Sequence, residues 1–167
     1  ISHIDYKHQE NTFMEYNREP FIPHFLSIEG PAFDVADVNN DGLVDVYLGG
    51  GKHQPGAIYL QNDWGEFKTV IDSVFIWDSH GEGVDAAFFN ANNDEFPDLY
   101  VAKGGNEFFA KMEPLKDCLY FGVGNGRFVK SQSALPDIYA NSACVKPTDI
   151  DQDGDLDLFV GSRSVPR

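Results

Sequence analysis

Three short stretches of the sequence place oxygen-bearing side chains at every second position, the pattern of a loop that binds a hard cation. In the clearest, Asp149, Asp151 and Asp153 alternate with other residues, and Asp157 follows four residues later. Protein-bound Ca2+ takes about six to eight oxygen ligands at roughly 2.3–2.6 Å. Alternating Asp and Asn residues would turn three side-chain oxygens to one side of a tight loop. The last Asp and a backbone carbonyl could complete the coordination shell.

The same spacing recurs twice earlier in the chain, with fewer carboxylates. The first copy consists of Asp37, Asn39, Asp41 and Asp45, and the second of Asn90, Asn92, Asp94 and Asp98. Gly42 and Gly154 occupy the turn position, where glycine adopts a positive φ without steric cost. The second copy has Glu95 at this position and an amide at its first oxygen position. We therefore expect Ca2+ as the cofactor, with two strong sites and a weaker third.

The residues after each acidic loop identify the kind of loop. An EF-hand requires a bidentate Glu at position twelve and flanking helices, but position twelve is Leu48 in the first copy and Val160 in the third. Short apolar runs of β-forming residues follow instead, at 46–48, 99–101 and 158–160. The alternative interpretation is a set of Asx-rich hairpin turns without metal. Because three copies occur in register, we expect a cation in the bend between two strands.

Composition limits the class of protein. The chain has 167 residues, of which 42% are hydrophobic and 14% aromatic, enough for one domain with a core. Its 16 Gly and 9 Pro residues indicate many turns between short strands. A formal charge of −15 argues against nucleic acid or an anionic membrane surface as a partner. No apolar run is long enough to span a membrane.

Calcium is plentiful outside cells, so we expect an extracellular or cell-surface protein that is exported by a leader outside this sequence, since Ile1 does not begin a signal peptide. Cys118 and Cys144 could form a disulfide or remain two separate buried thiols. The sequence leaves both possibilities open.

The segments around the loops form a repeat. Strands are expected at 32–38, 44–48, 57–60 and 66–71, and again at 84–89, 99–102 and 118–121, with a hairpin turn at 124–126. The loops begin at residues 37, 90 and 149, and an insertion around 108–112 accounts for the longer second interval. A period near 50 residues with four strands per unit is typical of a β-propeller.

We therefore predict an all-β chain of about two and a half propeller blades, each a four-stranded antiparallel sheet, from a larger propeller. The expected divisions are an N-terminal edge strand and aromatic arm at 1–33, blades at 34–83 and 84–142, and the first half of a third blade at 143–167. The edge strand rests on the alternation of Ile4, Tyr6 and His8. The rest of the parent chain is an expected partner.

The loops and their trailing strands resemble FG-GAP/VCBS repeats, such as those of the integrin α-subunit propeller. Residues 13–51, 54–62 and 104–107 resemble large exported bacterial VCBS-repeat proteins that carry an ASPIC/UnbV-type domain, relatives of cartilage acidic protein. The resemblance covers nearly the whole chain. It implies an extracellular, calcium-bound propeller within a longer polypeptide, and it says more about fold than about function.

Other candidate sites are weaker. The five histidines (His3, His8, His24, His53 and His80) lack the spacing of zinc ligands, which favours surface or packing roles. Ser79 and His80, with Asp78 or Asp85, could form a triad, but no nucleophile elbow or oxyanion framework accompanies them. The glycine runs at 49–51 and 104–105 precede no helix, so we interpret them as structural turns.

Two functions fit these features. The first is a non-enzymatic, calcium-stabilised binding or adhesion scaffold whose loops contact a glycan or a protein. Trp64, Trp77, Phe108 and Phe109 are candidate contact residues, although they could equally fill gaps between blades. The second is part of a calcium-dependent, lyase-like polysaccharide enzyme, with Lys103 and Arg163 on one rim. No catalytic constellation is identified, so the scaffold is favoured.

Overall fold

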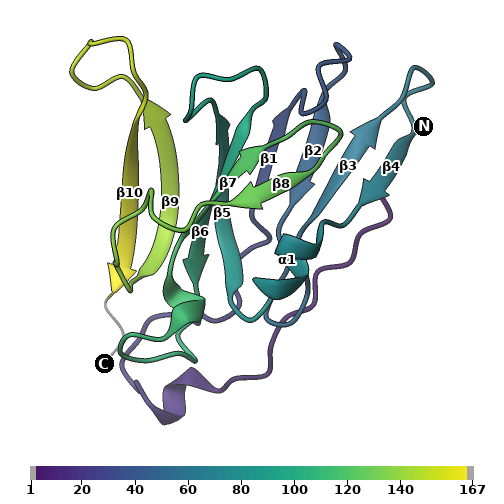
Figure 1. Cartoon of the computed structure of the whole chain (residues 1–167). Coiled ribbons are helices and arrows are strands. Elements are labelled where there is room, and N and C mark those ends of the chain that lie inside the picture. The colour runs from purple at the N-terminus through teal and green to yellow at the C-terminus, as the bar shows by residue number, and fades with distance from the viewer. Residues whose placement is uncertain (1–2, 165–167) are drawn as a thin grey trace.

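The computed structural model describes residues 3–164 and is all-β, with its strands in three antiparallel sheets (Figure 1). Sheet A contains β1 (Phe33–Ala36), β2 (Asp45–Leu48), β3 (Ala57–Gln61) and β4 (Phe67–Val70). Sheet B contains β5 (Glu82–Phe89), β6 (Asp98–Gly104), β7 (Cys118–Gly122) and β8 (Phe128–Lys130). Sheet C contains β9 (Asn141–Thr148) and β10 (Asp157–Ser164). Helical segments are η1 (Glu15–Asn17), α1 (Ser73–Trp77) and η2 (Glu113–Leu115).

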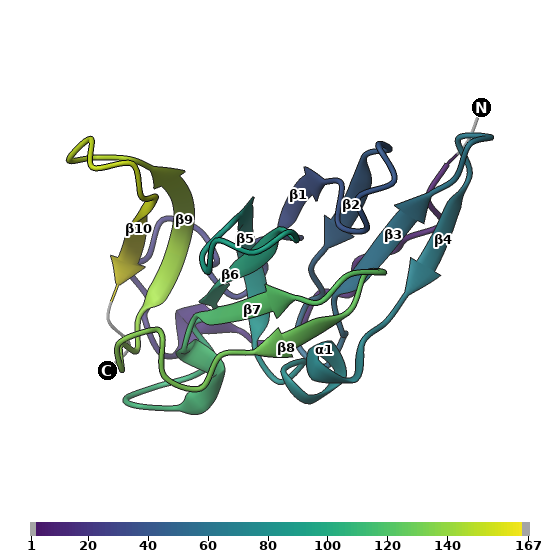
Figure 2. The same cartoon turned by 45° about the horizontal axis from the view of Figure 1, so that its top comes forward.

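Each four-stranded sheet is a meander in which consecutive strands pair. The register pairs Ala36 with Asp45, Phe89 with Asp98, and Thr148 with Asp157. Each acidic loop therefore joins the first and second strands of its sheet, as predicted. Two views show the sheets side by side in the order A, B, C, with the three loops at the same end (Figures 1 and 2). This arrangement is consistent with propeller-like blades.

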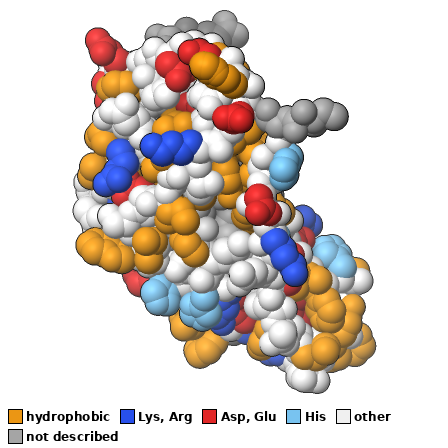
Figure 3. Space-filling model, turned by 90° about the vertical axis from the view of Figure 1, so that its right-hand side faces the viewer, with side chains coloured by type: hydrophobic (Ala, Val, Ile, Leu, Met, Phe, Trp, Pro, Cys, Tyr) orange, Lys and Arg blue, Asp and Glu red, His pale blue; other side chains and the backbone are white. Residues whose placement is uncertain are grey.

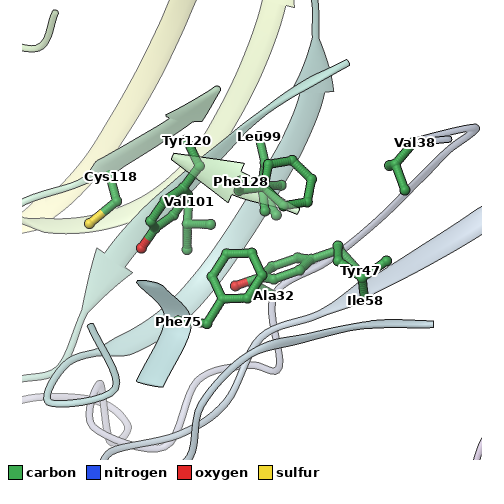
Figure 4. Packing of buried hydrophobic residues seen from close by; sticks show 11 residues of the cluster. Ala32, Val38, Tyr47, Ile58, Phe75, Leu99, Val101, Cys118, Tyr120 and Phe128 are labelled. Atoms are coloured by element: carbon green, nitrogen blue, oxygen red, sulfur yellow. The ribbon is translucent and has the colours of Figure 1, made fainter. Parts of the chain in front are cut away.

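The hydrophobic core lies between the sheets. Side chains of alternate residues on β6 point in opposite directions, so Leu99 and Val101 pack toward sheet A while Tyr100 and Ala102 pack toward sheet C. Sheet B is thus buried on both faces, which explains its nearly continuous apolar strands. In the first interface the Phe75 ring lies among those of Tyr47, Tyr120 and Phe128 (Figure 4).

Backbone-to-carboxylate hydrogen bonds also connect adjacent sheets. The amide of Phe88 on β5 donates to Asp34 of β1 at 2.6 Å, and the amide of Val145 on β9 donates to Asp85 of β5 at 2.9 Å. In both cases an Asp on the first strand of one sheet holds the first strand of the next. These acids fix the spacing between sheets in addition to apolar packing.

A short helix that the sequence analysis missed fills the connection between sheets A and B. Asp72 caps α1 by accepting the amide of Val74 at 3.4 Å, and it also accepts the amide of Phe128 at 3.0 Å. Arg127 lies 3.2 Å from the same carboxylate. Burial alone would raise the pKa of Asp72, but the two amides and the guanidinium hold it below the usual value.

The N-terminal segment differs from the prediction. The edge strand expected around Ile4, Tyr6 and His8 is wrong: within residues 3–32, η1 is the sole regular element. Side chains rather than a strand ladder hold this segment. The Tyr6 hydroxyl donates to the Gly49 carbonyl at 2.6 Å, and Gln54 bonds the backbone of residues 7 and 9. The alternating pattern therefore reflects contacts with a loop, not pairing with a sheet.

The structure contains two separate thiols rather than a disulfide between the two cysteines. Cys118 and Cys144 are both free, and the Cys118 thiol is buried in the interface between sheets A and B.

Among residues 3–164 no helix has both the length and the apolar character needed to cross a membrane.

Candidate metal-binding loops

The loop between β9 and β10 brings carboxylates together. Oxygen atoms of Asp149, Asp151 and Asp153 all lie within 4.8 Å of one another. The two Asp149 oxygens accept the amides of Asp153 and Gly154 at 3.2 and 3.1 Å, which folds the chain back over the first ligand position. Asp151 and Asp153 are exposed, so their side chains are accessible to an ion from solvent.

The loop between β1 and β2 has the same internal geometry. Asp37 accepts the amides of Asp41 and Gly42 at 3.1 and 2.8 Å, and the Asn39 amide donates to Asp41 at 2.9 Å. The predicted positive φ is confirmed at both turn glycines, +86° at Gly42 and +98° at Gly154. A non-glycine residue would be strained in this conformation.

The loop between β5 and β6 departs from the other two. Here Asn90 acts as a donor, and its side-chain amide contacts the Asp94 carbonyl at 2.6 Å. All three loops have a positive φ at the fourth position (Asn40, Asn93 and Gln152), but the first and third have another at the turn glycine, where the second loop has Glu95. The first position therefore does not receive the two backbone amides that shape the other loops. The difference concerns the shape of the loop, and the weaker second site stays a prediction.

The closing aspartates have a role that the sequence analysis missed. Asp45 accepts the amides of Val38 and Gln61 at 3.0 and 2.8 Å, and Asp98 accepts those of Ala91 and Gly122 at 2.7 and 2.9 Å. Each therefore ties the start of its acidic loop to the third strand of its sheet. Both aspartates are fully buried, and burial raises their pKa.

The equivalent Asp157 is exposed and accepts one amide, that of Ile150 at 3.1 Å. The contrast has a physical reason. Asp45 and Asp98 each accept a second amide from the third strand of a four-stranded sheet. Sheet C contains two described strands, so among the described residues no third strand supplies such an amide to Asp157. A carboxylate directly before an apolar strand is the sequence signal for this role.

The donor set fits calcium. The three loops offer carboxylate, amide and backbone oxygens, the hard ligands that Ca2+ prefers. In the first and third loops, the residues at the first three oxygen positions would hold the ion. Asp45, Asp98 and Asp157 already accept backbone amides and would contribute through their remaining lone pairs. Bound Ca2+ would neutralise the carboxylates that the bend brings together.

The alternative constellations considered from the sequence are not assembled. The Ser79 hydroxyl donates to the Ile76 carbonyl and the His80 ring contacts the Trp77 carbonyl, so these two side chains do not form a triad. Buried Lys103 donates to the carbonyls of Asp78 and Gly81 in a cleft of about 330 Å³. Arg163 does not line this cleft and instead pairs with Glu29 at 2.9 Å.

The candidate contact aromatics divide into exposed and buried residues. Trp64, at the tip of the β3–β4 hairpin, is 70% exposed, and Trp77, at the end of α1, is 77% exposed. Phe109 is also exposed, whereas Phe108 is only 6% exposed and packs beneath Lys52. The side of the molecule drawn in Figure 3 shows hydrophobic side chains at the surface among charged ones. Three of the four aromatics are therefore available to a ligand.

Comparison with known proteins adds a family for part of the chain. No curated protein sequence matches it. Residues 90–160, which run from the second acidic loop through the third and into β10, match the model of the FG-GAP-like repeat. The match contains the loop-and-strand pattern described above. Residues 90–160, which make up less than half of the chain, are therefore similar to an FG-GAP-like repeat.

Proposed function

We propose that the chain is a calcium-stabilised, propeller-like module of an exported protein and serves as a non-catalytic binding scaffold. The observation that carries this proposal is the convergence of three carboxylates in the exposed bend between β9 and β10. The finer resemblance to VCBS-repeat proteins with an ASPIC/UnbV-type domain belongs to the same proposal. In this role the ion fixes the shape of the bend, and neighbouring loops contact the ligand.

The physical basis is electrostatic. Carboxylates with oxygens within 4.8 Å of one another repel, and this repulsion opposes the folded bend. A cation that binds the native state and not the unfolded chain stabilises the native state by about 2.7 kcal/mol at a concentration 100 times its dissociation constant. Calcium would therefore raise the melting temperature of the protein.

Calorimetry and metal analysis of the purified chain test this part of the proposal. Exhaustive EGTA treatment should lower the melting temperature, and added Ca2+ should restore it. Asp63→Asn is a suitable control, because Asp63 is an exposed acid in the β3–β4 turn, outside the three loops. An unchanged melting curve after chelation, or calcium uptake that survives alanine substitution of Asp149 and Asp37 together, would contradict calcium stabilisation.

The ligand is proposed to be a glycan or a protein. Exposed aromatic rings beside polar loops bind sugars and protein surfaces well. The ring offers a large apolar surface, and in Trp the N–H group can also donate a hydrogen bond. A glycan array and a pull-down from extracellular material should identify ligands whose binding falls in Trp64→Ala or Trp77→Ala. Phe21→Ala is the matched control, since Phe21 is an exposed aromatic on the N-terminal segment. Release of unsaturated sugars in the same screen would instead indicate a lyase.

A further inference from the structure

A second cluster of ligating side chains lies away from the acidic loops. His8 and Glu10 on the N-terminal segment meet Glu82, the first residue of β5. The His8 Nε2 atom lies 3.2 Å from Glu10 Oε1 and 3.8 Å from Glu82 Oε1. No sequence pattern indicates this cluster, because Glu82 is 74 positions away from His8.

Three polar atoms of this cluster, His8 Nε2 and the two Glu82 oxygens, are buried without hydrogen-bond partners, whereas the Glu10 side chain is exposed. Glu82 is 1% exposed, and neither of its oxygens accepts a hydrogen bond. The His8 Nε2 atom is also buried, and its two carboxylate contacts lack hydrogen-bond geometry. Buried polar atoms without a partner cost about 1–3 kcal/mol each, and more when charged, so such a group points to a missing partner.

The hydrogen bonds of His8 indicate which ring nitrogen carries the proton. The Tyr6 hydroxyl donates its hydrogen to the Gly49 carbonyl at 2.6 Å, so its oxygen is free to accept. His8 Nδ1 lies 2.8 Å from that oxygen and is therefore the protonated nitrogen of the neutral ring. The lone pair of Nε2 then faces the two carboxylates. Such an outer partner is what orients most metal-ligating histidines.

The surroundings of Glu82 are electronegative. Glu82 is buried, and the carboxylates of Glu10 and Glu107 are near it. The Glu107 Oε2 atom is likewise buried without a hydrogen-bond partner. In the described part of the chain, His8 is the one basic side chain within 4.0 Å of the Glu82 carboxylate. The cluster is therefore short of positive charge.

We propose that His8, Glu10 and Glu82 form a binding site for a divalent transition-metal ion of the Zn2+ class. Ligand atoms at tetrahedral Zn2+ distances of about 2.0–2.2 Å lie roughly 3.4 Å apart, which agrees with the two measured separations of 3.2 and 3.8 Å. An imidazole nitrogen with two carboxylates suits Zn2+, whereas Ca2+ prefers oxygen alone. The site is thus chemically distinct from the acidic loops.

A metal here would attach the N-terminal segment to sheet B. Residues 6–9 already contact the turn after β2 through Tyr6 and Gln54. A metal joining His8 and Glu10 to Glu82 would add a contact with the start of β5. The site therefore serves a structural role, and its loss should release the segment while the sheets stay folded.

Titration of the tag-free chain with Zn2+ in saturating Ca2+ tests the proposal, because Ca2+ occupies the all-oxygen loops. We expect one Zn2+ per chain, with affinity at least tenfold weaker in both His8→Ala and Glu82→Gln. Tyr6→Phe removes the outer partner of His8 and should weaken binding by about 10- to 100-fold. His24→Ala is the control, since His24 also lies beside a carboxylate, Glu29, at 3.6 Å, and it should bind as the parent does.

Co2+ offers a second measurement, because its visible absorption reports nitrogen ligation and low coordination number. These bands should appear in the parent chain and disappear in His8→Ala. Absence of Zn2+ binding, or equal binding by the parent and the His8 and Glu82 variants, would overturn the site. Should Glu82→Gln fail to fold, His8→Ala and Tyr6→Phe decide the matter. Calcium dependence is read in a separate titration, so either proposal can fail alone.

Discussion

The buried Asp98 provides a quantitative test of how the acidic bends are held in place. Its two oxygens accept the amides of Ala91 and Gly122 at 2.7 and 2.9 Å. Asp98→Asn keeps the size of the side chain but replaces one accepting oxygen with an NH2 group. One of the two backbone N–H groups would then point at the new NH2 group and lose its hydrogen-bond acceptor.

The cost follows from these contacts. A buried amide left without an acceptor destabilises by about 1–3 kcal/mol, and the other bond loses the roughly 1 kcal/mol that separates a charged acceptor from a neutral one. We therefore expect Asp98→Asn to reduce the free energy of unfolding by about 2–4 kcal/mol. Asp45→Asn should behave alike, because Asp45 is equally buried and accepts two amides.

Urea denaturation in EGTA measures this loss without a contribution from calcium. Asp157→Asn is the internal control: Asp157 is exposed and accepts a single amide, so its loss should stay within about 0.5–1 kcal/mol. Equal losses at Asp98 and Asp157, or a loss below about 1 kcal/mol at Asp98, would refute the reasoning. The bends would then be held by something other than these carboxylates.

Three further predictions follow from the packing and the loops. Asp149→Ala should weaken calcium affinity more than Asn90→Ala, because Asp149 receives the backbone amides that shape its loop whereas the Asn90 side chain donates; calorimetric titration of both variants decides. Asp72→Asn should lower the free energy of unfolding by about 1–3 kcal/mol at neutral pH. The pKa of Asp72 in the folded state lies below 3.8. The difference in unfolding free energy between the parent and Asp72→Asn should therefore persist above pH 3.8 and shrink at lower pH, as acid protonates the folded carboxyl. Urea melts at each pH measure it. Phe75→Ala should cost about 3–5 kcal/mol through the cavity it leaves, whereas exposed Trp77→Ala should cost less than about 0.5 kcal/mol, and thermal or urea melts compare them.

Local patterns in the sequence predicted the acidic loops and the strands around them. The alternating oxygens are followed at once by apolar β-forming residues, as at Asp45 and Asp98, so loop and strand are encoded by neighbouring residues. The expected four-strand order was equally local, because antiparallel meanders pair consecutive segments. Apolar residues at successive positions of β6 agree with its burial on two faces in the structure.

Contacts between distant residues could not be predicted in the same way. Helix α1 contains Val74 and Ile76, which have modest helix propensity, and it depends on the Asp72 cap and on the burial of Phe75 between the sheets. The N-terminal alternation resembles a strand, yet Tyr6 bonds a loop carbonyl. These outcomes depend on which surface each segment meets after folding.

The burial of sheet B on both faces has a consequence for how the molecule opens. Sheet A contributes to one described interface and sheet C to the other, whereas every transient separation of sheets must expose a face of sheet B. Amide protons on β6 should therefore exchange with deuterium last, close to the rate set by global unfolding, while those of β4 and β10 exchange through smaller local openings. Protection from exchange would be highest in sheet B and lower in sheets A and C. This is the pattern expected when each repeat is stabilised by its immediate neighbours.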